Sequence, residues 1–232
     1  MRYLAIQEEH ELSGVMRDTF RRIKVNIEFS GLGQKSICIT SSVNNEGKST
    51  MALGIARAFA EDFNKKVLLV DADIRNSILH KRLQYEKSTQ GLTECLTGKI
   101  PIANAIYATN IEGFYLTPSG RVTRSSTQLL KRDTFKEYLR RTKEAFDIVI
   151  IDTSPLGPVV DAEIIASLSD ASLLVTGADM LTRKEIKRNI QALKRVNENF
   201  LGVILNKAKE KSDGYGKRYY KYYGEEIETN GK

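Results

Sequence analysis

The 232-residue sequence has little cysteine, and it has no long hydrophobic run. Its two cysteines, Cys38 and Cys95, lie far apart and lack metal-ligand spacing, which argues against a disulfide framework and against a cysteine-bound metal. No apolar run approaches the roughly 20 residues that a membrane-spanning helix needs. The residues after Met1 are too short a stretch, and too acidic, for a secretion signal. We therefore expect a reduced, cytoplasmic protein that reaches a membrane only through a partner or a surface patch.

The composition is that of a globular domain with an excess of positive charge. Hydrophobic residues make up 41% of the chain, enough for the core of one α/β domain. The net charge of +7 and the pI of about 9.3 indicate an anionic partner such as a nucleotide, a nucleic acid or a membrane surface. The sequence contains no internal repeat or linker, so we expect one domain over residues 1–207.

Apolar runs alternate along the chain with segments of helical periodicity. The predicted strands are residues 36–40, 66–71, 114–117, 147–152, 171–176 and 201–206. The predicted helices are residues 13–29, 49–62, 126–131, 134–145, 160–167 and 183–197, with short helical pieces at 77–83, 91–96 and 102–106. This alternation is typical of a doubly wound α/β fold, a mostly parallel sheet flanked by helices.

A predicted strand, a polar loop and the start of a helix follow one another at residues 36–50. Gly47, Lys48 and Ser49 open the helix, where backbone N–H groups and the helix dipole stabilise anionic oxygens. Lys48 can reach the β- and γ-phosphates of a nucleotide, and the Ser49 hydroxyl can ligate Mg²⁺. Ser42 replaces the first glycine of the usual phosphate-loop pattern. The predicted nucleotide contacts of the loop are Ser42, Asn44, Asn45, Glu46, Gly47, Lys48, Ser49 and Thr50.

Three aspartates follow apolar strands. Asp71 ends one predicted strand, Asp73 follows it directly, and Asp152 ends another. Ligands of open parallel sheets bind at the carboxyl ends of the strands, so these carboxylates should join the phosphate loop in one site. Mg²⁺ needs only Ser49, phosphate oxygens and one or two carboxylates, and a remaining carboxylate can accept a proton from an attacking hydroxyl. Each aspartate alone could be a strand-end turn former, but the set predicts nucleotide hydrolysis or phosphoryl transfer.

These residues resemble the motifs of the bacterial tyrosine kinases that act with capsule and exopolysaccharide machinery, the CpsD/CapB type of the P-loop family. Residues 41–50 are similar to the Walker A motif of that family, residues 67–75 to Walker A′, and residues 148–155 to Walker B. The likeness runs from about residue 13 to the end of the chain. Walker A′ is the more specific motif, because Walker A and B alone fit many ATPases.

The resemblance also implies roles for the site residues, with ATP and Mg²⁺ as ligands. Lys48 is implied to bind phosphates, Ser49 and Asp152 to hold Mg²⁺, and Asp73 to assist the metal. Asp71 is the favoured base, although the division of labour between Asp71 and Asp73 stays open. The expected catalytic residues are thus Lys48, Asp71 and Asp73.

Two further positions follow from the same resemblance. Asn206 stands where related ATPases contact adenine, with a strand-end cap as the alternative. Asn44 and Asn45 stand where family loops often have proline and glycine. Asparagine tolerates a positive φ, so we expect that the loop can still close.

The N-terminal helix of the family carries a Glu-x-x-Arg-x-x-Arg oligomerisation pattern. Its nearest match here is Asp18, Arg21 and Lys24, although lysine cannot reproduce the bidentate fork of arginine. The periodicity places Thr19 and Ile23 on the inner side of the predicted helix and predicts a solvated charged face on the other side. The resemblance implies a ring-like homo-oligomer built through this helix.

The apolar pattern stops at residue 208, and residues 208–232 are predicted to form a flexible tail. The tail contains half of the ten tyrosines, namely Tyr215, Tyr219, Tyr220, Tyr222 and Tyr223. A phenol has a pKa of about 10 and needs a carboxylate or a metal to assist its deprotonation, so such a tail can offer phosphoacceptors to a neighbouring copy. Stacking on single-stranded nucleic acid and a plain disordered tail are the alternatives.

We therefore expect an ATP-dependent protein-tyrosine kinase that autophosphorylates its tail in trans. The resemblance implies that it regulates capsular or exopolysaccharide synthesis and export at the inner face of the cell membrane. The implied partners are other copies of the chain, a membrane-embedded activator (a polysaccharide co-polymerase) and a cognate tyrosine phosphatase, with no nucleic acid. The alternative is a Min/Par-type partitioning or regulatory ATPase, although those proteins carry an extra lysine at the place of Val43.

Overall fold

A computed structural model describes residues 2–7, 14–30, 33–62, 64–157 and 159–208. Its framework is an eight-stranded sheet with the order β1-β4-β5-β3-β6-β2-β7-β8, and among the described strands only the β4–β5 pair is antiparallel. The strands are β1 (Arg2–Leu4), β2 (Ser36–Ser41), β3 (Val67–Asp71), β4 (Tyr107–Thr109), β5 (Phe114–Thr117), β6 (Ile148–Asp152), β7 (Ala171–Gly177) and β8 (Phe200–Asn206). The predicted mostly parallel, doubly wound sheet is confirmed.

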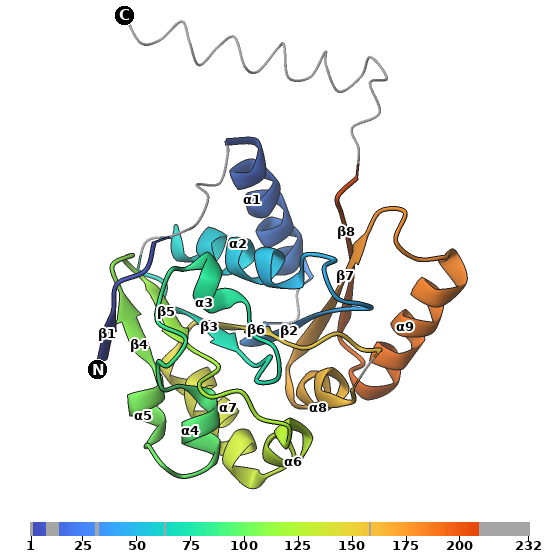
Figure 1. Cartoon of the computed structure of the whole chain (residues 1–232). Helices are drawn as coiled ribbons and strands as arrows, with labels where there is room; N and C mark the ends of the chain where they lie inside the picture. Colours follow the sequence, from blue (N-terminus) through green and yellow to red (C-terminus); the bar gives the residue numbers. More distant parts are fainter. Residues whose placement is uncertain (1, 8–13, 31–32, 63, 158, 209–232) are drawn as a thin grey trace, which may run out of the picture.

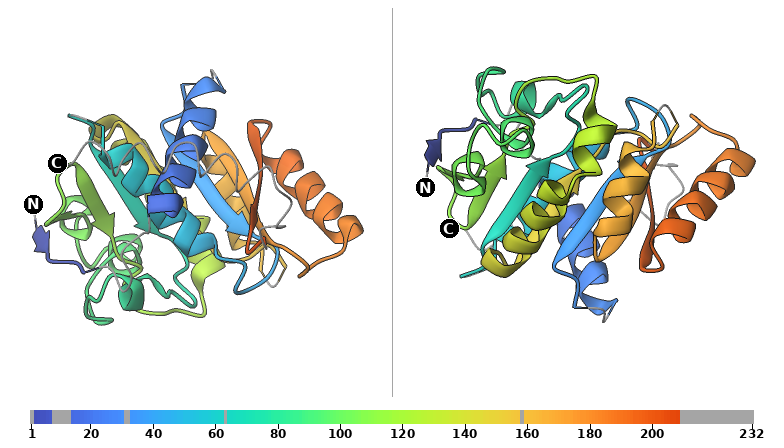
Figure 2. Two further views of the ribbon diagram at one scale, coloured as in Figure 1. Left: turned by 90° about the horizontal axis from the view of Figure 1, so that it is seen from above. Right: turned by 90° about the horizontal axis from the view of Figure 1, so that it is seen from below.

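Helices cover both faces of this sheet (Figure 1, Figure 2). One face carries α1 (Gly14–Phe29), α2 (Lys48–Ala60) and α3 (Leu79–Arg82). The other face carries α4 (Leu92–Leu96), α5 (Ile102–Ala105), α6 (Ser126–Leu130), α7 (Asp133–Ala145), α8 (Asp161–Leu168) and α9 (Arg183–Val196). Every residue of the central strands β2, β3, β6 and β7 is buried, because helices exclude water from both of their faces. The described part of the chain contains no helix long and apolar enough to cross a bilayer.

Helix α1 packs mainly on α2, and its orientation differs from the prediction. A Cβ at Gly54 of α2 would lie 2.2 Å from the Phe20 ring, so glycine permits the close approach of the two helices. Phe20 is buried and Thr19, which was predicted to face inward, is exposed. Lys24 was predicted on the solvated face, but its side chain is only 12% exposed and pairs with Asp62. The solvated-face prediction fails at this position because acidic residues follow the end of α2.

Two described strands, β1 and β4, were not predicted. Each has only three residues, too few to show an alternating pattern. Tertiary contacts hold them instead, since Arg2 in β1 donates to the Tyr107 hydroxyl in β4 at 3.2 Å. Of the predicted tail, residues 208–232, all but residue 208 lie outside the described residues.

The sheet order places the three predicted motif strands side by side as β3, β6 and β2. Asp71 and Asp152 are register partners at the carboxyl ends of β3 and β6. The phosphate loop leaves the same end of β2 and leads into α2. The predicted meeting of the loop and the carboxylates at one edge of the sheet is therefore confirmed.

Candidate nucleotide-binding site

The loop between β2 and α2 has the shape of a phosphate cradle. Gly47 precedes α2 with a φ of 98°, and Asn45 has a φ of 65°, which confirms that asparagine closes the loop in the left-handed region. A Cβ at Gly47 would lie 2.1 Å from the Asn206 Nδ2 atom and would be strained by the positive φ, so glycine is favoured there. Ser42 does not have a positive φ, and glycine is not needed at its position.

The Glu46 side chain holds this loop from within. Its Oε2 atom accepts hydrogen bonds from the backbone N–H groups of Ser42 (2.6 Å) and Val43 (2.8 Å). Its Oε1 atom accepts from the Thr176 hydroxyl (3.0 Å) and the Gly177 N–H (3.1 Å) at the end of β7. Glu46 is fully buried, so its carboxylate organises the loop and faces away from the nucleotide pocket. The sequence predicted Glu46 as a nucleotide contact and gave no signal for this structural role.

Lys48 lies between the carboxylates of the neighbouring strand ends. Its Nζ atom donates to Asp73 Oδ2 at 2.9 Å, lies 3.6 Å from Asp152 Oδ1, and lies 3.3 Å from the Ser49 hydroxyl. Burial lowers the pKa of Lys48, but the Asp152 and Asp73 carboxylates outweigh this effect, and the net pKa is raised. The lysine therefore stays protonated and balances part of the negative charge of the site.

Asp71 and Asp152 are buried more deeply than Asp73. Asp71 Oδ2 accepts a hydrogen bond from the Ser77 hydroxyl, whereas Asp71 Oδ1 and Asp152 Oδ1 have no hydrogen-bond partner among the described residues. Burial, with the adjacent Asp152 carboxylate, raises the pKa of Asp71 well above its usual value. Burial also raises the pKa of Asp152, against the opposing effect of Lys48. Three acids thus share one lysine, which leaves room for a further cation.

The donor set fits Mg²⁺. A Ser49 hydroxyl beside the Asp152 carboxylate, whose Oδ1 atom accepts no hydrogen bond from the described residues, supplies the oxygen ligands that Mg²⁺ prefers. In the described part of the chain no three His, Cys, Asp or Glu side chains converge as a closed metal cage. Such a site agrees with a metal that is shared with nucleotide phosphates and water.

A pocket of about 570 Å³ opens beside the loop. Its lining residues are Asn44, Asn45, Gly47, Lys48, Ser49, Thr50, Asp73, Asn76, Ile78, Arg82, Asn206 and Lys207. The structure thus brings most of the predicted contacts to one wall, while Ser42, Glu46, Asp71 and Asp152 lie behind it. Asp73, rather than Asp71, is the carboxylate exposed to the pocket.

Arg82 and Lys207 are pocket residues that the sequence did not single out. Arg82 ends α3, and its Nε atom is buried without a hydrogen-bond partner among the described residues. Lys207 donates to the Asn45 carbonyl at 2.6 Å, and Asn206 donates to the Glu46 carbonyl at 2.8 Å. Asn206 therefore anchors the loop through this hydrogen bond and also lines the pocket. No residue pattern predicted that Arg82 lines the pocket, because its position depends on how α3 packs beside the loop in the folded chain.

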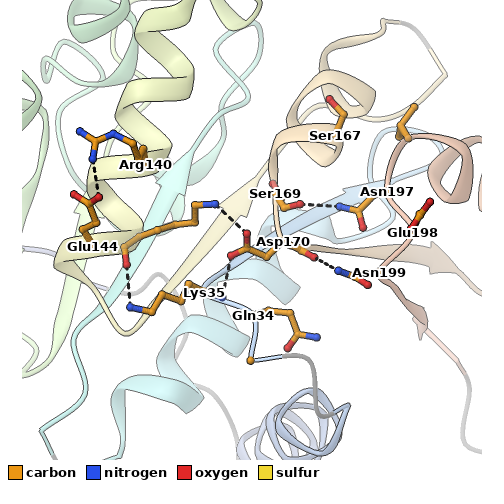
Figure 3. A pocket seen from close by; sticks show the side chains of 13 residues that line it. Gln34, Lys35, Arg140, Glu144, Ser167, Ser169, Asp170, Asn197, Glu198 and Asn199 are labelled. Carbon is orange, nitrogen blue, oxygen red and sulfur yellow. Dashed lines mark hydrogen bonds and ion pairs between the residues drawn. The ribbon is translucent and has the colours of Figure 1, made fainter.

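A larger hollow, of about 790 Å³, lies at the opposite, amino edge of the sheet (Figure 3). Asp170 is its central charged group and accepts hydrogen bonds from Lys143 Nζ (2.9 Å) and from the N–H groups of Lys35 (3.0 Å) and Ser36 (2.9 Å). Arg140 and Glu144 pair with each other at its rim. Asp170, Lys143, Arg140 and Glu144 are thus satisfied within the protein, whereas the Asp71 Oδ1 atom at the other edge has no hydrogen-bond partner among the described residues.

Comparison with known proteins identifies the family of the chain. Residues 34–207 match the family model described as an AAA domain. The tyrosine-protein kinase CpsD of Streptococcus pneumoniae is 35% identical over 94% of this chain and 95% of its own length. The chain belongs to the bacterial tyrosine kinases of this type. The tyrosine-protein kinase YwqD of Bacillus subtilis is also 35% identical, over 89% of this chain and 86% of its own length.

Solved structures agree with this family. The kinase domain of the Escherichia coli tyrosine kinase ETK is 29% identical, with a TM-score of 0.79 over 86% of this chain and 78% of that chain. The cell division ATPase MinD of Pyrococcus furiosus is 26% identical, with a TM-score of 0.64 over 74% of this chain and 71% of that chain. The fold is thus shared with Min-type ATPases, and the kinase domain superposes on more of the chain.

Proposed function

We propose that this protein binds ATP with Mg²⁺ in the loop pocket and transfers the γ-phosphoryl group to tyrosine. One observation carries the proposal: the ends of β2, β3 and β6 bring the Asp73 and Asp152 carboxylates within 4 Å of the Lys48 Nζ atom beside a phosphate-binding loop. Phosphoryl transfer needs positioning and charge neutralisation more than covalent chemistry, and this arrangement supplies both.

Lys48 and the loop provide the binding interactions. Lys48 pairs with Asp73 and Asp152, and its ammonium group can also donate charge-assisted hydrogen bonds to phosphate oxygens that enter the pocket. The N–H groups at the start of α2 face the same space and stabilise anionic oxygens. Mg²⁺ bound by Ser49 and Asp152 would neutralise charge that develops between the β- and γ-phosphates.

Asp71 is the proposed base. Its raised pKa makes the carboxylate a better proton acceptor for a phenol than an ordinary aspartate. Asp73 lines the pocket, but its carboxylate is already engaged in an ion pair with Lys48 at 2.9 Å. Access to Asp71 would require the Ser77 hydroxyl, its hydrogen-bond partner, to move aside.

The proposed acceptors are the tail tyrosines Tyr215, Tyr219, Tyr220, Tyr222 and Tyr223. The tail begins directly after Lys207, which belongs to the pocket wall. We propose transfer in trans, between copies of the chain. Each phosphorylation adds about −1.5 to −2 charges, so several events would reverse the charge of the tail and could release it from the site.

The cellular role is proposed from the family. It comprises regulation of capsular or exopolysaccharide synthesis at the inner face of the membrane, with a membrane-embedded activator and a cognate phosphatase. The α1 residues proposed to hold a ring-like oligomer together already have partners in the same molecule. Arg21 pairs with Glu61 at 2.9 Å, and Lys24 pairs with Asp62. A ring built through these residues has to share or exchange these pairs.

Two incubations with ATP and Mg²⁺ test the proposal. Phosphotyrosine should form on the wild-type chain, whereas release of phosphate without phosphotyrosine would make the chain an ATPase of the Min/Par type. For the trans step, full-length Lys48→Met protein is mixed with active protein truncated after Asp213. Label on the longer, inactive chain supports transfer between molecules, and its absence in the mixture would show that each chain modifies only itself.

A further inference from the structure

Helix α9 carries most of the net charge of the protein. Six of its fourteen residues are cations and Glu185 is its single acid, so the helix holds a net +5 of the +7 of the whole chain. The cations are Arg183, Lys184, Lys187, Arg188, Lys194 and Arg195, and all six are exposed. Glu185 forms no ion pair with these cations in the described structure, and its carboxylate accepts hydrogen bonds from the N–H group and hydroxyl of Thr182 in the helix cap.

The α9 cations differ from those of α7, another charged helix on the same face of the sheet. In α7, Lys136 pairs with Asp133, Arg140 with Glu137 and Glu144, and Lys143 with Asp170. None of the six α9 cations forms an ion pair with any residue that the structure describes. Glu163 of α8 borders the same hollow as Arg188 and Arg195, yet it pairs with neither. The positive charge of α9 is therefore available to an external anion.

Four of the six cations form one stripe along the outer side of the helix. Lys184, Lys187, Arg188 and Arg195 recur at spacings of three, four and seven residues, which places them on one face. Leu193, on the opposite side, is buried against the second core cluster. The helix lies at the outer edge of the molecule beside β8 (Figure 1, Figure 2), and its fourteen residues extend over about 20 Å.

The chemistry of the stripe favours a lipid surface over a folded partner. Protein interfaces depend on buried aromatic or aliphatic anchors, and no large hydrophobic side chain of α9 is exposed. Stacking on single-stranded nucleic acid requires aromatic side chains, and α9 has none. A row of unpaired cations on an exposed helix is suited to binding a broad anionic surface. Each Lys or Arg then adds to the binding free energy through its charge alone.

We propose that α9 docks this protein directly on an anionic lipid bilayer. Its basic stripe lies along the headgroups, and the apolar side of the helix stays packed on the sheet. Docking of this kind is purely electrostatic, so it is reversible and weakens as salt increases. It supplies a membrane contact that requires neither a spanning helix nor a protein partner.

Vesicle binding by the full chain tests this proposal. Wild-type protein is sedimented with vesicles of phosphatidylcholine, alone or mixed with phosphatidylglycerol, at low and high salt. We expect binding only to the anionic vesicles and loss of binding at high salt. The variant K184Q/K187Q/R188Q/R195Q should bind them roughly 100-fold or more weakly, since each cation contributes about fivefold.

The matched control is K87Q/K99Q/R121Q/K131Q, which removes the same charge from exposed cations outside α9. This control should retain binding within about twofold of wild type. Equal losses in both variants would show attraction to net charge only, and unchanged binding of the α9 variant would place the contact elsewhere; either result overturns the proposal. Tighter α9-dependent binding to a DNA duplex than to the vesicles at the same salt would also overturn it. Circular dichroism and thermal unfolding confirm that both variants are folded.

Discussion

Charged side chains gather at both edges of the sheet, but the two edges differ in how far these side chains are neutralised and hydrogen-bonded. At the carboxyl edge, Asp71, Asp73 and Asp152 share the single lysine Lys48, and two carboxylate oxygens lack hydrogen-bond partners among the described residues. At the amino edge, Asp170 accepts hydrogen bonds from a lysine side chain and two backbone N–H groups (Figure 3).

The pKa directions follow from this difference. Burial raises the pKa of Asp71 well above its usual value, whereas for Asp170 the Lys143 side chain and the backbone donors outweigh burial and lower the pKa. A raised acid pKa makes folding less favourable as the pH rises, and a lowered one makes it less favourable as the pH falls. Ionisation of Asp71 at the carboxyl edge therefore destabilises the folded state, whereas ionisation of Asp170 at the amino edge stabilises it. Such a cost is typical of a functional site.

The largest effect that separates the two edges is expected for Asp71→Asn. The rate of phosphotyrosine formation should fall by about 10²–10⁴-fold, the contribution of a general base. The unfolding temperature without nucleotide should rise, because the amide is uncharged where burial penalises a carboxylate. This gain should be greater at about pH 8 than at about pH 5, since the cost of ionising Asp71 appears only as the pH rises. Thermal unfolding at both pH values measures it.

Asp73→Asn is the control for that variant. Asp73 pairs with Lys48 at 2.9 Å, so its replacement removes a partner of a buried cation and should give no gain in stability. If Asp71→Asn instead lowers the unfolding temperature at both pH values, Asp71 stabilises the fold and the contrast between the edges is lost.

A smaller effect of the opposite kind is expected for Asp170→Asn. The free energy of unfolding should fall by about 2 kcal/mol, because the amide cannot replace the charged acceptor of Lys143 and of two N–H groups. The kinase activity of the folded variant should stay near that of wild type. The exposed Asp133→Asn change serves as the control, with an expected loss below about 0.5 kcal/mol.

The effect of Asp170→Asn on the free energy of unfolding should also depend on pH. The pKa of Asp170 is lowered in the folded state, so its contribution is present above the unfolded pKa of about 3.9 and is lost as the pH falls through the folded pKa. The difference between wild type and variant, measured by urea unfolding, should shrink below about pH 4. A difference that stays constant with pH would mean that the ionised carboxylate contributes nothing.

The same contrast explains what the sequence could predict. Apolar runs that end in Asp71 and Asp152, and the Gly47-Lys48-Ser49 start of α2, are local signals, and the order of parallel strands then brings them together. The clamp by Glu46 depends on Thr176, which is 130 residues away, so no local pattern predicts it. The same holds for Phe20, which replaces Thr19 in the core because α2 offers Gly54 as a gap. Contacts between distant segments, rather than motifs, account for what the sequence missed.

The smallest predicted effect concerns Arg82, the cation that the fold adds to the carboxyl edge. Arg82→Gln should weaken ATP binding roughly 10-fold, because a charge-assisted contact to phosphate is replaced by a neutral one. Lys81→Gln, at the adjacent exposed position, should leave binding within about twofold of wild type. Displacement of a fluorescent nucleotide by AMP, ADP and ATP measures the effect. A loss that grows from AMP to ATP would show that the Arg82 guanidinium contacts the phosphate chain. Equal losses for the three nucleotides would show that Arg82 only shapes the pocket. The affinity of the pocket for anions would then come from Lys48 and the loop.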